Sequence, residues 1–248
     1  MLAVLVVAWL VAPADGAPAA SGAPAPRRPV VVELFTSEGC SSCPPADRVL
    51  RELAATQPVA GAEVLPLELH VDYWNDLGWK DPFSDAAYSA RQASYGASRV
   101  YTPQMIVAGG EEFVGSDAAR ARQAIARAAG TKGTAVAVAL HLEGTPKDPA
   151  RLTVRVDVGA HAEPADVILA LTEDGLATDV PRGENAGTRM VHAPVVRLLR
   201  VVDPKTATEL TLAPGWKRAN LRVVAFVQAH GAHGAPGVIS GAAAARLP

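Results

Sequence analysis

The pattern of apolar positions in the first half of the chain predicts a mixed α/β unit. Residues 30–36 form a run of β-branched, apolar and aromatic side chains that is typical of a buried strand. A helix should follow, because Pro44-Pro45 suit its first turn, where a missing N–H leaves no hydrogen bond unmade, and its apolar stripe ends by Pro58. A pair of cysteines therefore lies at the start of a helix, directly after a strand.

Further elements extend this unit to residue 131. The predicted elements are a strand over 63–71, a helix capped by Ser84 that runs to about residue 95, two strands over 104–107 and 111–114 joined at Gly109-Gly110, and a helix capped by Ser116 over 117–129. A loop rich in aromatic and acidic residues, 72–82, connects the second strand to the second helix. The expected order is β-α-β-α-β-β-α.

From residue 132 to the end, the pattern changes to short β-rich runs separated by Gly, Pro and Asp turns. These runs are 135–142, 152–158, 166–171, 195–202, 209–212 and 221–228. Their spacing predicts an antiparallel, sandwich-like second domain over 132–248. The fold class expected for the chain is α/β, with a domain over 30–131 followed by this β-rich region.

The amino-terminal 29 residues are expected to be a signal peptide and linker. Residues 1–12 are apolar but too few to span a bilayer, and small residues and prolines follow up to Pro29. We therefore expect a periplasmic or secreted protein with no stable membrane span after signal cleavage. Export bears on the cysteines, because an oxidising compartment lets a disulfide persist.

The charge balance narrows the classes of partner. The chain has 23 Lys and Arg residues against 25 Asp and Glu residues. No summed electrostatic field therefore favours nucleic acid or an anionic membrane surface, and nucleic-acid binding is not expected.

The chemistry of the chain centres on Cys40-Ser41-Ser42-Cys43. At a helix start, the helix dipole and the free backbone N–H groups stabilise a thiolate on the first cysteine. We expect Cys40 to attack a substrate disulfide, and Cys43, one turn further and more buried, to resolve the mixed disulfide. The expected partners are thiols and disulfides of other proteins, and no bound cofactor is expected.

Two alternatives for the cysteine pair remain open. A bridge between Cys40 and Cys43 could be structural, although so short a loop removes little entropy from the unfolded chain. Zinc normally takes four ligands and the chain has no second cysteine pair, so no metal site is predicted, but two thiolates alone can bind Cu(I). The rival hypothesis is a non-catalytic protein, either a Cu(I) handler or an interaction module with a structural disulfide.

Other residues near the predicted dithiol are auxiliary candidates. Pro103 precedes a strand after the second helix, the place where thioredoxin folds have a cis-proline facing the dithiol, and Thr102 comes with it. Glu33 lies in the strand that leads to the cysteines, where a buried carboxylate could accept a proton from the resolving thiol. By strand alternation, Glu33 could instead point to the surface. Glu38, beside Cys40, would oppose thiolate formation if close to it.

Two loops could contribute to a substrate site. The loop after the second strand is crowded with His70, Asp72, Tyr73, Trp74, Trp79, Lys80 and Asp81. It could line a cleft near the dithiol, with Trp79 as a candidate contact, or pack on its own aromatic side chains. His70-x-Asp72 supplies only two ligands for a metal ion. The polar stretch 182–187 is expected to be a turn between strands that could dock on the first domain.

Several stretches together resemble a bacterial family of secreted thioredoxin-like proteins that is catalogued only as a domain of unknown function. They are 34–47 (LFTSEGCSSCPPAD), 70–74 (HVDYW), 77–83 (LGWKDPF), 101–104 (YTPQ) and 182–187 (RGENAG). The resemblance covers about residues 30–202. It implies a thioredoxin-like core with an appended β-rich region, and it carries over Cys40, Cys43 and Pro103 as the redox site. It implies no particular substrate.

Overall fold

The structure is a computed structural model that describes residues 27–96, 100–131, 137–145, 148–161 and 164–247. The signal peptide and linker were expected over residues 1–29, of which residues 1–26 lie outside the described part. The last two, Arg28 and Pro29, belong to the first strand. Among the described residues, no helix is long and apolar enough to cross a membrane.

The first half of the chain has the order of elements that its sequence predicts. The elements are β1 (Arg28–Thr36), α1 (Pro44–Thr56), β2 (Ala62–His70), α2 (Ala86–Ser94), β3 (Gln104–Val107), β4 (Glu111–Val114) and α3 (Ala118–Ala129). In both later helices the N-cap lies one residue after the expected one. Asp85 accepts the N–H of Ala87, and Asp117 accepts the N–H of Arg120, because a carboxylate satisfies a free helix N–H as well as a hydroxyl does.

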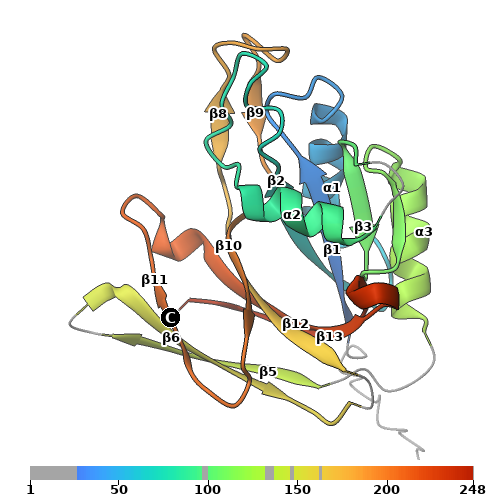
Figure 1. Cartoon of the computed structure of the whole chain (residues 1–248), viewed down its shortest axis with the longest axis vertical. Helices are drawn as coiled ribbons and strands as arrows, with labels where there is room; N and C mark the ends of the chain where they lie inside the picture. Colours follow the sequence, from blue (N-terminus) through green and yellow to red (C-terminus); the bar gives the residue numbers. More distant parts are fainter. Residues whose placement is uncertain (1–26, 97–99, 132–136, 146–147, 162–163, 248) are drawn as a thin grey trace, which may run out of the picture.

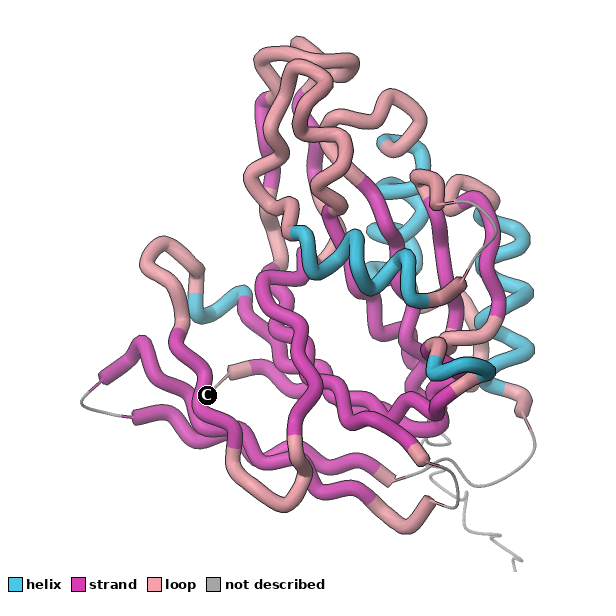
Figure 2. Tube along the Cα trace, in the orientation of Figure 1, coloured by secondary structure: helices cyan, strands magenta, loops and turns pink. Residues whose placement is uncertain are grey.

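The second half contributes most of the strands of this mixed α/β, β-rich fold (Figure 2). The strands are β5 (Val138–Thr145), β6 (Asp148–Val158), β7 (Ala165–Glu173), β8 (Ala177–Asp179), β9 (Arg189–Val191), β10 (Val195–Val202), β11 (Thr208–Thr211), β12 (Leu221–His230) and β13 (Pro236–Arg246). Two short 3-10 helices, η1 (Arg218–Asn220) and η2 (Ala232–Gly234), flank β12.

One large sheet joins the two halves of the chain. Its strand order is β13-β12-β7-β10-β2-β1-β3-β4, so four strands of the second half extend the sheet of the first half. The junction is the pairing of Val195 in β10 with Glu68 in β2. The β-rich region was expected as a domain of its own, but the open edge of β2 gives it a strand to pair with. The three-stranded sheet β11-β6-β5 packs over β7 and β12 and makes the sandwich-like part.

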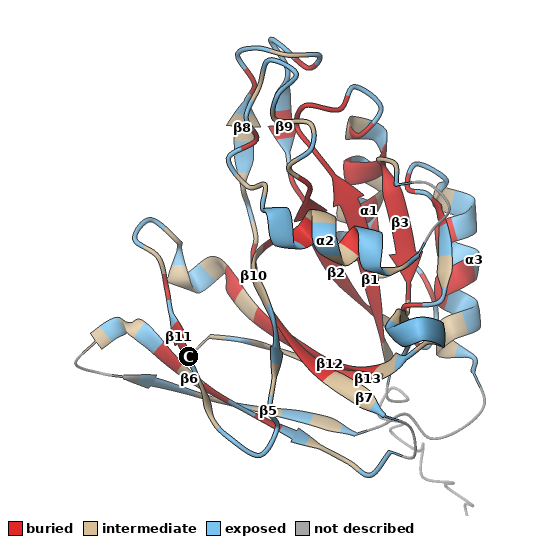
Figure 3. Cartoon of the chain, in the orientation of Figure 1, coloured by how far each residue is buried: buried red, intermediate tan, exposed pale blue. Residues whose placement is uncertain are grey.

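The large sheet is covered differently on its two faces (Figure 1). Val30, Val32 and Leu34 of β1 point to the face that packs under α1 and α3. Val31 and Phe35 alternate with them and point to the face that carries α2. The strands between these layers are almost wholly buried (Figure 3). The almost uniformly apolar run of β1 therefore contributes alternate side chains to two hydrophobic cores, one on each face of the sheet.

Candidate active site around a buried disulfide

Three chain segments meet at one end of the large sheet. β1 and β2 are parallel, and their last residues, Thr36 and His70, are register partners. β3 is antiparallel to β1 and begins opposite Phe35, so the Thr102-Pro103 segment that precedes it reaches the same end. The dithiol loop after β1, the aromatic loop after β2 and Thr102-Pro103 are therefore neighbours, although they are far apart in the sequence.

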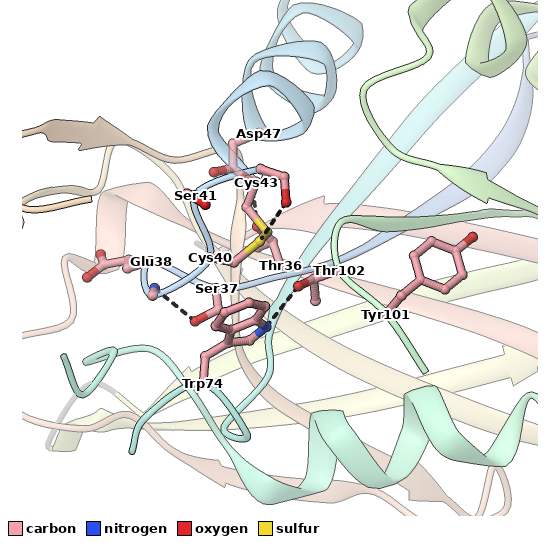
Figure 4. The surroundings of a disulfide bond; sticks show 12 residues. Thr36, Ser37, Glu38, Cys40, Ser41, Cys43, Asp47, Trp74, Tyr101 and Thr102 are labelled. Carbon is pink, nitrogen blue, oxygen red and sulfur yellow. Dashed lines mark hydrogen bonds between the residues drawn. A yellow bond between two sulfur atoms is a disulfide. The ribbon is translucent and has the colours of Figure 1, made fainter. Parts of the chain in front are cut away.

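Cys40 and Cys43 form a disulfide at the start of α1 (Figure 4). Cys43 is the N-cap residue, and its carbonyl accepts the N–H groups of Ala46 at 2.8 Å and Asp47 at 3.1 Å. The hydroxyl of Ser42 lies 3.5 Å from the sulfur of Cys40. The position at a helix start is the one that makes a thiolate a good nucleophile and a good leaving group.

Both cysteines are fully enclosed. The sequence argument expected Cys43 to be the more buried of the two, but Cys40 and Cys43 both have 0 % of their surface exposed. Only the intervening serines, Ser41 and Ser42, are exposed. Trp74 packs over the loop so closely that a Cβ on Gly39 would lie 3.2 Å from that of Trp74.

The polar stretch 182–187 is the other cover of the disulfide. The side-chain amide of Asn185 donates to the carbonyl oxygens of Glu38, at 2.8 Å, and Cys40, at 3.0 Å. The carboxylate of Glu184 accepts the N–H of Ser41 at 3.0 Å. This turn, which we call the strap, thus docks on the dithiol loop. Asn185 had no signal in the sequence beyond the turn, because its partners are backbone carbonyls about 145 residues away.

Replacing Asn185 with alanine should loosen the strap. The buried carbonyls of Glu38 and Cys40 lose their donor, which costs about 1–3 kcal/mol of stability. The disulfide should then be reduced by dithiothreitol about tenfold faster, the factor that corresponds to 1.4 kcal/mol. The rate can be followed by quenching with a thiol-specific alkylating agent.

Asn220→Ala is the matched control, because the Asn220 amide donates to the carbonyl of Asp174 at 3.0 Å in another part of the fold. It should lower the melting temperature without changing the reduction rate. Equal reduction rates in Asn185→Ala and the wild type would show that the strap does not govern access to the disulfide.

Thr102 and Pro103 lie beside the disulfide, as their place in the topology requires. The Thr102–Pro103 peptide bond is cis. The indole N–H of Trp74 donates to the Thr102 hydroxyl at 2.8 Å, and both residues border the disulfide in Figure 4. The carbonyl of Pro103 accepts the N–H of Gly115 at 2.9 Å, which fixes the segment to the end of β4. The aromatic loop therefore reaches the dithiol through Trp74.

Trp79 lies one contact away from the disulfide, at the side chain of Glu38. Its indole N–H donates to one carboxylate oxygen of Glu38 at 2.8 Å, and the other oxygen lies 3.0 Å from Nε2 of His192. Glu38 is fully buried. Its two carboxylate oxygens thus face Trp79 and His192, which the sequence analysis did not predict as partners.

Asp47 is a buried carboxyl group that the sequence argument missed. It lies one helical turn after Cys43, at the i+4 spacing that places two side chains on one helix face (Figure 4). It is 3 % exposed, and the Thr36 hydroxyl donates to it at 2.7 Å. Burial, with the nearby charge of Glu68 adding to it, raises the pKa of Asp47 to about 7. The Cys-x-x-Cys-x-x-x-Asp spacing was the signal that could have found it.

Glu33 lies on the opposite face of the sheet from α1. Residue alternation along β1 places it with Val31 and Phe35 under α2, where Arg91 binds its carboxylate with two donors, at 2.5 Å and 3.0 Å. Tyr95 also donates to it. The expectation that Glu33 points to the surface is wrong, since its exposed fraction is 0 %. It is buried as an ion pair, on the face away from Cys43.

The model of a family described as "Protein of unknown function (DUF1223)" matches residues 31–228. An X-ray crystal structure of a protein from Agrobacterium tumefaciens is similar at 30 % identity, with 88 % of this chain and 93 % of that chain covered and a TM-score of 0.64.

HBP35 of Porphyromonas gingivalis is similar at 18 % identity, with 91 % of this chain and 77 % of that chain covered and a TM-score of 0.63. At this identity, the likeness concerns the fold alone. A search among curated proteins found no match.

Proposed function

The chain belongs to the DUF1223 family, whose description assigns no activity, and we propose from its site that it is an exported thiol–disulfide exchange protein. The first half would act as a thioredoxin-like unit, with Cys40 as the attacking residue. The observation that carries the proposal is the Cys40–Cys43 disulfide at the first turn of α1, a position where the helix dipole favours a thiolate.

The proposed exchange has two steps. The Cys40 thiolate attacks one sulfur of a substrate disulfide, which forms a mixed disulfide and releases the first substrate thiolate. Cys43 then loses its proton to the Asp47 carboxylate, and its sulfur attacks that of Cys40. The mixed disulfide breaks, the second substrate thiolate leaves, and the Cys40–Cys43 bond forms. The substrate gains the two electrons that the dithiol loses, and the same steps run backward when the chain oxidises a dithiol.

Features around the disulfide support a protein substrate. Tyr73, with 42 % of its surface exposed, and Leu77, with 57 %, stand on the aromatic loop that contacts the dithiol loop through Trp74. The same loop meets the strap, where Gly78 approaches Gly183. Exposed apolar side chains beside a reactive group offer a docking surface to an unfolded or extended chain. The enclosed sulfurs require that the strap moves before exchange.

The reduction potential and the reactivity of Cys40 test the proposal together. The mature protein is equilibrated in glutathione redox buffers, and the alkylation rate of the reduced protein is followed against pH. An exchange protein should have a potential in the range of known exchange proteins, about −120 to −270 mV, and a Cys40 thiol pKa well below the ordinary value near 8.5. A potential below about −300 mV with an unreactive Cys40 would leave a structural disulfide as the better account.

The rival functions give different results on the same samples. A Cu(I) handler should bind one equivalent of Cu(I) when reduced and none when oxidised, because only thiolates are ligands for it. An interaction module with a structural disulfide should bind its partner equally well with Cys40→Ser. The exchange proposal expects neither outcome.

A further inference from the structure

A cluster of buried side chains next to the dithiol supplies no atom to the proposed exchange steps. Glu68 and His70 lie two residues apart at the end of β2, so they point to one face of the strand. His192 joins them from the segment between β9 and β10. None of the three side chains has any exposed surface. We call these three residues the buried triad.

The donor atoms of the buried triad converge on one point. Oε1 of Glu68 lies 3.6 Å from Nε2 of His70 and 3.4 Å from Nδ1 of His192, and one donor atom from each residue lies within 4.8 Å of the others. A tetrahedral ion with bonds of about 2.0–2.1 Å separates its ligand atoms by roughly 3.3–3.4 Å. The two measured separations are therefore close to the edges of such a tetrahedron.

The atoms that face the centre of the triad lack hydrogen bonds. Both carboxylate oxygens of Glu68, Nε2 of His70 and Nδ1 of His192 are buried without a hydrogen-bond partner among the described residues. Leaving a buried polar atom unpaired costs about 1–3 kcal/mol, and more if the group is charged. Three of these atoms, one from each residue, lie close enough together to share one cation as their partner.

The outward-facing nitrogens of both imidazoles are held by carboxylates. Nδ1 of His70 lies 2.7 Å from Oδ2 of Asp81, and Nε2 of His192 lies 3.0 Å from Oε1 of Glu38. When an imidazole is neutral and donates its one ring N–H to this carboxylate, the lone pair of its other nitrogen is directed into the triad. This outer carboxylate is the usual second partner of a histidine that binds a metal ion, because it fixes the ring and its tautomer.

We propose that Glu68, His70 and His192 bind one divalent transition-metal ion, with Zn²⁺ as the ion that two imidazoles and one carboxylate suit. The site uses neither cysteine, so the proposal does not rest on the exchange function. The sequence analysis weighed His70 only together with Asp72, as too few ligands for a metal ion, and the Asp72 carboxylate accepts the Ser89 hydroxyl at 2.5 Å. The third ligand, His192, follows His70 by more than a hundred residues, so no local spacing indicates it.

The rival arrangement is an ion-pair network without metal, in which both imidazoles are protonated. Burial opposes the charge of His192, but hydrogen bonds to carboxylates outweigh it and raise the pKa of His192 to about 9. Such a network should draw its donors to about 2.7–2.9 Å from the central carboxylate. The separations of 3.4 Å and 3.6 Å are longer than that, whereas the outer pairs at 2.7 Å and 3.0 Å are close.

An ion in the triad would join the segments that surround the disulfide. Asp81 binds the N–H of Glu38 at 2.8 Å as well as His70, and Glu38 lies two residues before Cys40. The ring of Phe83 stands edge-on to both imidazoles, with centroid distances of 5.4 Å to His70 and 5.1 Å to His192. Phe83 also lines a surface pocket of about 260 Å³, so movement of its ring offers the ion a way in.

The test measures Zn²⁺ bound to the oxidised full chain. The protein is stripped with a chelator, dialysed against buffered Zn²⁺ and analysed by mass spectrometry of the metal content. We expect one Zn²⁺ per chain, and at least a tenfold loss of affinity in His192→Gln. His141→Gln is the matched control, because His141 is exposed on β5 and paired with Asp157. It should bind Zn²⁺ like the wild type.

Two further variants keep the test decisive. The double variant Cys40→Ser, Cys43→Ser should retain the bound Zn²⁺, and its loss would place the ion on the thiols and overturn the proposal. If His192→Gln does not fold, Asp81→Asn takes its place, with an expected 10- to 100-fold weaker affinity, since Asp81 holds a ligand without being one. Absence of Zn²⁺ from the oxidised wild type, or equal binding by all variants, would also overturn it.

Discussion

Replacing Cys40 with serine should abolish disulfide exchange, while replacing Cys43 with serine should trap the intermediate. Without the Cys40 thiolate there is no attacking group, so the rate should fall to that of the buffer thiols, a loss of about a thousandfold or more. Without Cys43 the first step still occurs, and the mixed disulfide has no internal thiol to resolve it. The expected product of Cys43→Ser is a covalent adduct through Cys40.

Gel electrophoresis under non-reducing conditions measures both outcomes, with a reducible substrate protein present. The asymmetry between the two variants is the informative result, because a structural disulfide loses the same bond in either case. Ser42→Ala serves as the control, since it removes the hydroxyl 3.5 Å from the Cys40 sulfur and leaves both thiols. If neither single variant forms an adduct, or if both do so equally, Cys40 is not the attacking group.

Some parts of the site could be predicted from the sequence and others could not. The start of α1 was predictable from Pro44-Pro45 and the apolar stripe, and the parallel strands around it from two buried runs. Those features are local, and they bring the dithiol and Thr102-Pro103 to one end of the sheet. The residues that cover the disulfide come from distant parts of the sequence. Asn185 binds backbone carbonyls, which leave no trace in the pattern of side chains.

Strand β13 illustrates the same limit in the fold. Its sequence, PGVISGAAAAR, is rich in glycine and alanine, residues with low preference for strands, and no strand was predicted there. It forms because β12 offers a row of backbone hydrogen-bonding groups, and the residues from Arg222 to Val227 pair with β13 in unbroken register. Tertiary pairing thus overrides local preference. The joining of both halves into one sheet through β10 and β2 has the same origin.

Asp47→Asn should make the folded protein more stable at high pH. The pKa of the Asp47 carboxyl is raised from an ordinary 3.8 to about 7, with burial as the main cause. The folded protein therefore keeps a proton that the unfolded chain releases, so the free energy of unfolding falls as pH rises from about 4 to about 7. The contribution of the protonated Asp47 carboxyl to the free energy of unfolding is fully present below pH 4 and lost above pH 7. The pKa difference corresponds to at most about 4 kcal/mol.

Asparagine is always neutral and can still accept the Thr36 hydroxyl, so it removes the charge penalty. The second oxygen of Asp47 has no hydrogen-bond partner among the described residues, and the amide that replaces it would lack one too, which offsets part of the gain. We expect Asp47→Asn to be about 1–3 kcal/mol more stable than the wild type at pH 8 and no more stable at pH 4. Urea unfolding at both pH values measures this.

Exposed Asp76→Asn is the control, and it should leave the pH dependence unchanged. A wild-type stability that does not fall between pH 4 and pH 7 would mean that Asp47 is ionised without penalty in the folded state.

The same substitution should slow the resolving step. Asparagine cannot accept the Cys43 proton, and loss of a positioned general base typically costs about 10²- to 10⁴-fold in rate. The wild-type rate of resolution should rise with pH through about 7, where the Asp47 carboxylate forms, and Asp47→Asn should lack that rise. A variant that gains stability and loses this rate would show that the buried carboxyl is kept for chemistry, because its charge opposes folding. A variant that gains stability and keeps the rate would assign the proton to water.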